Sequence, residues 1–170
     1  MKKLVAILLV AMMLFTVAMA EGVTVGHKLG KPHGAQGFAE VTVVLQDDVI
    51  IAVYLDEYQF MDPTAEGVVG VPNSDATFGT NVVEGKVLGS KRESTVYYSA
   101  NMADHAGATV AIDANYDAIQ AFVVGKTIAE VKEAIEGKEA AEVIDAVSGA
   151  TLADTPNYLA LIIEAAEAAK

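Results

Sequence analysis

The chain has 170 residues with 23 acidic and 11 basic side chains, so its formal net charge is −12. A surface this acidic repels nucleic acid and anionic lipid and favours basic partners. The absence of cysteine excludes disulfides, cysteine-ligated metals, iron–sulfur clusters and a lipid anchor on cysteine. The length is that of one domain with short extensions.

Residues 1–20 have the composition of a secretory signal peptide. Lys2 and Lys3 precede an apolar run that closes with Ala-Met-Ala at 18–20, a small-x-small cleavage site. An uncleaved membrane anchor is the alternative, but the run is short for a span, which needs about 20 apolar residues. We therefore expect export to the periplasm, cell surface or medium, with cleavage after Ala20. Cleavage removes two lysines and no acid, which takes the formal charge from −12 to −14.

The domain proper is expected at 37–170, after a segment at 21–36 that shows little hydrophobic periodicity and is interpreted as a flexible lead-in. Residues 38–45 and 49–55 are rich in β-branched side chains, and a Gln-Asp-Asp turn signal separates them. This pattern predicts an antiparallel hairpin. Its second strand is apolar nearly throughout, which predicts burial on both faces.

Glycine and proline punctuate residues 56–92, which predicts long irregular loops. Short strands are predicted at 95–99, at 108–112 and, further along, at 143–147. The remainder of the chain is predicted to be mostly helical.

Three helices follow from apolar spacing and from terminal residues. The first ends at Gly125, and the second begins with the capping-box pair Thr127 and Glu130. The last has Thr155 at a plausible N-cap and Pro156 at its first position. The order of elements predicts an α+β fold, a single small domain whose antiparallel hairpin or sheet is packed by C-terminal helices.

Residues 145–151 read Asp-Ala-Val-Ser-Gly-Ala-Thr and carry the most chemistry in the chain. Gly149 permits a tight backbone, and a helix that starts just after the segment offers N–H groups to a phosphate. Ser148 and Thr151 supply hydroxyls, and Asp145 can orient a hydroxyl or hold a metal during a transfer reaction. A strand-to-helix turn in which Thr151 merely helps to cap the helix explains the same residue types.

The same seven residues resemble the flavinylation motif of the FMN-binding domain family. That family includes the flavin subunits of sodium-pumping NADH:quinone reductase and of Rnf complexes, and many exported bacterial redox proteins. Its pattern is aspartate, two variable residues, Ser or Thr, a small residue, then Ala-Thr, and every position is filled here. The resemblance implies that Thr151 carries FMN through a phosphoester bond, with Asp145, Ser148, Gly149 and Ala150 as recognition residues.

The resemblance also implies partners. In the family, a separate magnesium-dependent flavin transferase attaches the cofactor outside the cytoplasm, with FAD as donor. The bound flavin then exchanges electrons with a membrane redox module or with other carriers. Two similar stretches, at 74–77 and 104–109, depart from the pattern in residue type or spacing. We predict that neither Thr77 nor Thr109 carries flavin.

The leading function is therefore an extracytoplasmic electron-transfer flavoprotein. The alternatives are an extracytoplasmic flavin-dependent reductase of a small molecule and a non-redox secreted binding or surface protein with the same fold. With no cysteine and three scattered histidines, no metal site is expected.

Several aromatic residues are candidates for contact with the flavin ring, although core packing or surface placement is the more frequent role for each of them. These candidates are Tyr58, Phe60, Phe78, Tyr97 and Tyr98.

Overall fold

The computed structural model describes residues 22–76, 78–79 and 82–170. The leader expected at 1–20 and Thr77 of the motif-like stretch at 74–77 lie outside these residues. One four-stranded antiparallel sheet has the order β1-β2-β3-β4. The strands are β1 (Val23–Gly30), β2 (Phe38–Gln46), β3 (Val49–Met61) and β4 (Val87–Ser90), with a short 3-10 turn, η1 (Gly34–Gln36), before β2.

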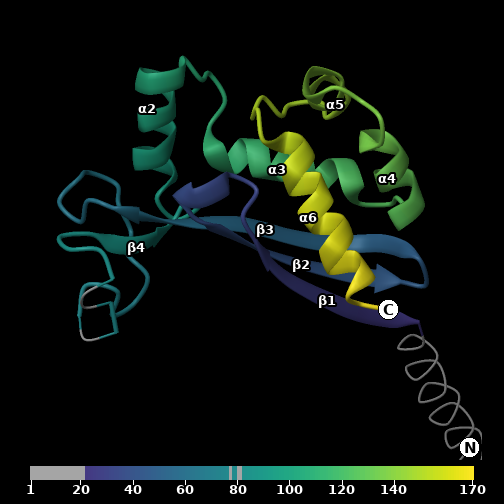
Figure 1. Ribbon diagram of the computed structural model, residues 1–170, viewed down its shortest axis with the longest axis horizontal. Coiled ribbons are helices and arrows are strands. Elements are labelled where there is room, and N and C mark those ends of the chain that lie inside the picture. The colour runs from purple at the N-terminus through teal and green to yellow at the C-terminus, as the bar shows by residue number, and fades with distance from the viewer. Residues whose placement is uncertain (1–21, 77, 80–81) are drawn as a thin grey trace, which may run out of the picture.

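The helices are α2 (Thr95–Ala106), α3 (Ile112–Val123), α4 (Ile128–Ile135), α5 (Ala140–Ala146) and α6 (Thr155–Glu167). Figure 1 shows α3 and α6 lying across one face of the sheet, where α6 contacts β1 and β2 and α3 contacts β3. The fold is therefore α+β, as the order of elements predicts. Side chains of both layers form the core, among them Val41, Val43, Leu55, Ile119, Leu159 and Ile162.

The predicted hairpin is confirmed as β2 and β3, which pair with Val43 opposite Val53. Asp47 in the connecting turn has a φ of 56°, a conformation that aspartate tolerates in tight turns. The prediction that the second strand is buried on both faces is wrong, because Tyr54 is 46% exposed and Ile51 is 42% exposed. In the described residues, helices cover one face of this sheet (Figure 1), and the exposed side chains of β3 lie in its first half, because Leu55, Asp56 and Glu57 are buried in succession.

The lead-in expected at 21–36 is the clearest error. Residues 23–30 form the edge strand β1, which pairs with β2 along its whole length. Gly26 lies directly under α6, where a Cβ would come within 1.8 Å of the carbonyl oxygen of Ala165. The glycine that weakens the strand pattern in the sequence is thus what lets the helix approach the sheet.

All three short strands predicted after residue 92 are wrong. Residues 95–99 open helix α2, 108–111 form the connection into α3, which begins at residue 112, and 143–147 lie mostly in α5. The irregular region is also shorter than expected, because β3 continues to Met61 and β4 occupies 87–90. Short runs of β-branched residues do not distinguish a strand from a buried helical face, and packing decides between them.

The helix ends predicted from capping residues agree more closely with the structure than the predicted strands do. The Thr127 and Glu130 capping box of α4 is confirmed, since the Thr127 side chain accepts from the Glu130 N–H and the Glu130 side chain accepts from the Thr127 N–H. Gly125 follows α3 with a φ of 84°. The start of α6 differs by one position, because Asp154 is the N-cap and Thr155 is the first helical residue.

Candidate functional site

The motif at 145–151 spans the last turn of α5 and the loop that follows it. Val147 is 1% exposed and Ala150 is 6% exposed, so these two residues fix the loop to the core. Ser148, Gly149 and Thr151 are exposed, as is Asp145 on α5. The motif therefore presents its hydroxyls and its aspartate to solvent while its apolar residues hold it in place.

A tight turn joins the two buried residues of the motif. The N–H of Ala150 donates to the carbonyl oxygen of Val147 at 3.0 Å, and Gly149 has a φ of 92°. This is the glycine position of a type II turn, which other residues occupy only with strain. A Cβ on Gly149 would lie 3.4 Å from the Cβ of Ala118, an ordinary contact, so backbone conformation rather than space favours glycine.

Thr151 is held by Asn115 on helix α3. The amide oxygen Oδ1 of Asn115 accepts from the backbone N–H of Thr151 at 2.6 Å and from its hydroxyl at 3.2 Å. The Asn115 side chain is fully buried, although Thr151 itself is exposed. Because the threonine hydroxyl donates its only proton inward, both oxygen lone pairs remain available on the exposed side.

No protein-family model, curated protein or solved structure matches the chain. The resemblance to FMN-binding proteins therefore stays a prediction from the sequence, carried mainly by residues 145–151.

The start of α6 does not provide the free N–H groups expected for a phosphate. The N–H of Thr155 donates to the carbonyl of Leu152 at 3.0 Å, and that of Asn157 donates to the carbonyl of Asp154 at 2.9 Å. Pro156, between them, has no N–H. The first turn of α6 is thus already satisfied within the chain.

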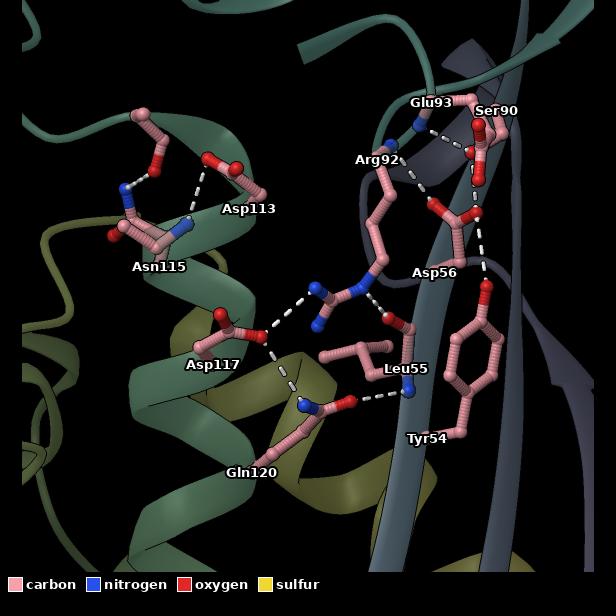
Figure 2. Close-up of polar contacts among 12 residues, drawn as sticks. Tyr54, Leu55, Asp56, Ser90, Arg92, Glu93, Asp113, Asn115, Asp117 and Gln120 are labelled. Atoms are coloured by element: carbon pink, nitrogen blue, oxygen red, sulfur yellow. Dashed lines mark hydrogen bonds and ion pairs between the residues drawn. The ribbon is translucent and has the colours of Figure 1, made fainter.

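Helix α3, which carries Asn115, is fixed to the sheet by the polar contacts that Figure 2 shows. The Arg92 guanidinium donates from Nε to the carbonyl of Leu55 at 2.6 Å and from Nη1 to Asp117 at 2.8 Å. The side-chain oxygen of Gln120 accepts from the N–H of Leu55 at 2.7 Å. These contacts tie two positions of α3 to one residue of β3, so the helix has little freedom to shift.

Asp56 closes the same network on the sheet side (Figure 2). Its carboxylate accepts from the hydroxyl of Ser90 at 2.5 Å and from the N–H of Glu57 at 2.7 Å. Burial raises the pKa of the Asp56 carboxyl above its ordinary value, and these two hydrogen bonds offset part of that increase. These contacts join β3, the segment after β4 and α3, and we assign the network a structural role.

A second buried polar cluster surrounds Glu57. Its Oε1 pairs with Nζ of Lys91 at 3.0 Å, and its Oε2 accepts from the hydroxyls of Tyr158 and Tyr116. The ring nitrogen Nδ1 of His33 lies 3.1 Å from Nζ of Lys91. Burial raises the pKa values of both tyrosine hydroxyls well above the ordinary range, so they remain protonated donors. The residues of this cluster are far apart in the sequence, so no local pattern predicts it.

The aromatic residues considered for contact with a flavin ring lie in different parts of the structure. Tyr98 is buried with Nζ of Lys91 4.3 Å from its ring centroid, and Tyr58 stacks on Phe38 at 5.2 Å. Phe78 is 72% exposed, and Tyr97 lines a surface pocket of about 320 Å³ on α2. Contact of any of them with a flavin ring stays a prediction.

The motif-like stretch at 104–109 has a different structure from the motif. Gly107, with a φ of 64°, ends helix α2, and its N–H donates to the carbonyl of Ala103. Thr109 is exposed in the connection to α3, and no side chain among the described residues forms a hydrogen bond with its hydroxyl. The resemblance at Gly-Ala-Thr thus reflects a helix C-terminus.

In the part of the chain that the structure describes, no helix is long and apolar enough to cross a membrane. Within the same residues, His, Asp and Glu side chains form no group of three or more that could hold a metal ion.

Proposed function

We propose that this chain is an extracytoplasmic electron-transfer flavoprotein that carries one FMN on Thr151. The observation that carries the proposal is an exposed threonine hydroxyl, at the end of a complete flavinylation-type motif, whose proton is directed at a buried amide. The leader-like composition of residues 1–20 supports a location outside the cytoplasm.

Attachment is a phosphoryl-type transfer from FAD, made by a separate magnesium-dependent transferase. The hydroxyl oxygen of Thr151 bonds to the phosphorus on the riboflavin side of FAD, and the bond from that phosphorus to the bridging oxygen breaks. AMP leaves with the bridging oxygen, and the threonine proton is released to solvent. No electron is gained or lost, so the flavin keeps its oxidation state during attachment.

The residues of the motif have distinct parts in this proposal. Gly149 shapes the turn that exposes Ser148 and Thr151, and the buried Val147 and Ala150 keep that turn on the core. The exposed Asp145 is available to the transferase as a recognition residue. The small side chains leave the turn open to a bulky ligand.

When bound, FMN supplies the redox chemistry, and the chain supplies attachment and orientation. A covalent bond makes occupancy independent of the local FMN concentration, which matters outside the cell where free flavin diffuses away. The exposed position of Thr151 leaves the attached group accessible to redox partners. This arrangement suits an electron carrier better than an enzyme with an enclosed substrate site.

The decisive experiment is intact-mass analysis with peptide mapping of the exported chain, made in a host that contains the flavin transferase. We expect one mass increase equal to FMN less water, located on the peptide that contains Thr151. Thr151→Ala should remove it, and the matched variant Thr109→Ala should retain it. An unlabelled wild-type chain, or a label on Thr77 or Thr109, would overturn the proposal.

The labelled protein also separates the two redox alternatives. A carrier should be reduced and reoxidised by other redox proteins without saturable turnover of a small substrate. Saturable reoxidation by a defined small molecule would favour the reductase.

A further inference from the structure

We propose that Asn115 is the positioning residue of the flavin attachment point, and that transfer of FMN to Thr151 depends on its amide oxygen. The inference rests on the proposed function, because it concerns the same hydroxyl. Asn115 lies 36 residues before Thr151, on a different element, and is no part of the motif at 145–151.

The orientation of the Asn115 amide is set within the first turn of α3. Its Nδ2 donates to the carbonyl oxygens of Val110 at 3.2 Å and Ala111 at 3.0 Å. Only the NH₂ group can face two carbonyls, so the amide oxygen must face Thr151. The side chain thus makes four hydrogen bonds while fully buried, which leaves it no alternative arrangement.

The two bonds to Thr151 have different fates in the reaction. The hydroxyl proton is lost when the oxygen becomes an ester oxygen, so the contact between the Thr151 Oγ1 and Asn115 ceases to be a hydrogen bond. The 2.6 Å bond from the backbone N–H remains. Before transfer, Asn115 selects the side-chain rotamer that points the lone pairs of Oγ1 outward. After transfer, it keeps the attachment point fixed on α3.

The anchor itself is rigid. The N–H of Ile112, at the start of α3, donates to Oγ of Ser99 at 3.0 Å, which ties the helix to α2. The contacts of Arg92 and Gln120 tie its later turns to β3. Asn115 therefore links the exposed motif loop to a helix that is itself fixed to the sheet and to α2. A nucleophile held in one orientation before the reaction needs such a fixed support.

The test is steady-state transfer of FMN from FAD to the purified, unlabelled exported chain by purified transferase. Asn115→Ala should lower kcat about tenfold, the equivalent of one lost hydrogen bond. The KM for the chain should stay within about twofold of wild type, because the exposed recognition residues are untouched. Asn115→Asp keeps an acceptor oxygen but places its second carboxyl oxygen against the carbonyls of Val110 and Ala111, so it should not restore kcat.

The control is Thr127→Ala, which removes a side-chain hydrogen bond at the start of α4, outside the contacts that hold α3 and Thr151. It should destabilise the chain and leave kcat near the wild-type value. Equal kcat losses in Asn115→Ala and Thr127→Ala would mean that Asn115 acts only through stability, and would overturn the inference. A wild-type chain that accepts no FMN would overturn the proposed function as well.

A measurement on the wild-type chain needs no variant. Hydrogen exchange at the Thr151 amide should be slow compared with exchange at exposed amides without a partner, because Asn115 accepts its proton. Fast exchange at Thr151 in the folded protein would contradict the anchoring role.

Discussion

Nζ of Lys91 lies 3.0 Å from Oε1 of Glu57, and each side chain is only 1% exposed. The pair sits between the loop after β4 and the middle of β3, with the hydroxyls of Tyr116 and Tyr158 on the second carboxylate oxygen. Two opposite charges withdrawn from water are tolerated when each is paired and hydrogen-bonded. The cluster therefore joins the sheet to α3 and α6 at a point where loss of one partner leaves a buried charge.

Replacement of one member of this pair should be severely destabilising. Lys91→Met leaves the Glu57 carboxylate buried without its cation, and we expect the free energy of unfolding to fall by about 3–5 kcal/mol. Urea unfolding followed by circular dichroism measures the change. The double variant Lys91→Met with Glu57→Gln should recover much of the loss, because no charge then remains buried. A double variant as unstable as the single one would show that packing, not charge, dominates there.

The buried carboxyl of Asp56 should give stability a defined pH dependence. Burial raises its pKa in the folded chain above the ordinary value of 3.8, so the folded state binds this proton more tightly than the unfolded state. The free energy of unfolding contributed by Asp56 should therefore fall as pH rises from about 3.8 through the raised pKa. Asp56→Asn removes this proton site and should flatten that part of the profile.

Urea unfolding of both proteins at closely spaced pH values through this window tests the sign. The difference in stability should shift in favour of Asp56→Asn as pH increases. A shift in favour of the wild type would mean that the hydrogen bonds from Ser90 and Glu57 outweigh burial, and that the folded pKa is lowered.

The parts of the fold that sequence predicts well are those set by local chemistry. The Thr127 and Glu130 capping box satisfies backbone groups three residues apart, so its signal and its structure coincide. The hairpin turn at Asp47 is equally local. The strand β1 cannot be predicted from neighbouring residues alone, because Gly26 interrupts its pattern of β-forming residues. The close approach of α6, a distant segment, explains why glycine is needed there. Packing between distant segments accounts for most of the errors.

The candidate site likewise has one part that the sequence predicts and one part that only the folded structure reveals. The motif at 145–151 is continuous, so pattern alone identifies Thr151 and Gly149 as its special positions. Asn115 has no such signal, since its link to Thr151 exists only after α3 and the motif loop meet. A buried asparagine in the first turn of a helix indicates a contact with another segment, because its side-chain amide must find hydrogen-bond partners inside the protein. Asparagine is also a frequent N-cap residue, but the N-cap of α3 is Ala111, so capping preference does not account for Asn115.

The capping box of α4 allows stability to be changed away from the motif. Thr127→Ala removes the side chain that accepts from the N–H of Glu130, and we expect a loss of about 1 kcal/mol. For a domain of this size that corresponds to a fall in Tm of roughly 2–4 °C. Thermal unfolding measures it, and FMN transfer to Thr151 should be unaffected in the folded variant. An unchanged Tm would mean that solvent satisfies the helix end equally well.

Two exposed glycines with positive φ permit a controlled test of the motif turn. Gly149 has a φ of 92° in the motif, and Gly137 has a φ of 68° after α4. Alanine at either position forces a strained backbone or a local rearrangement, at a cost of about 1 kcal/mol or more. Gly149→Ala and Gly137→Ala should therefore lose similar stability in urea unfolding. Only Gly149→Ala should also slow FMN transfer, because its turn positions the N–H and hydroxyl of Thr151 against Asn115. Equal transfer rates in the two variants would show that the transferase does not depend on the shape of the turn.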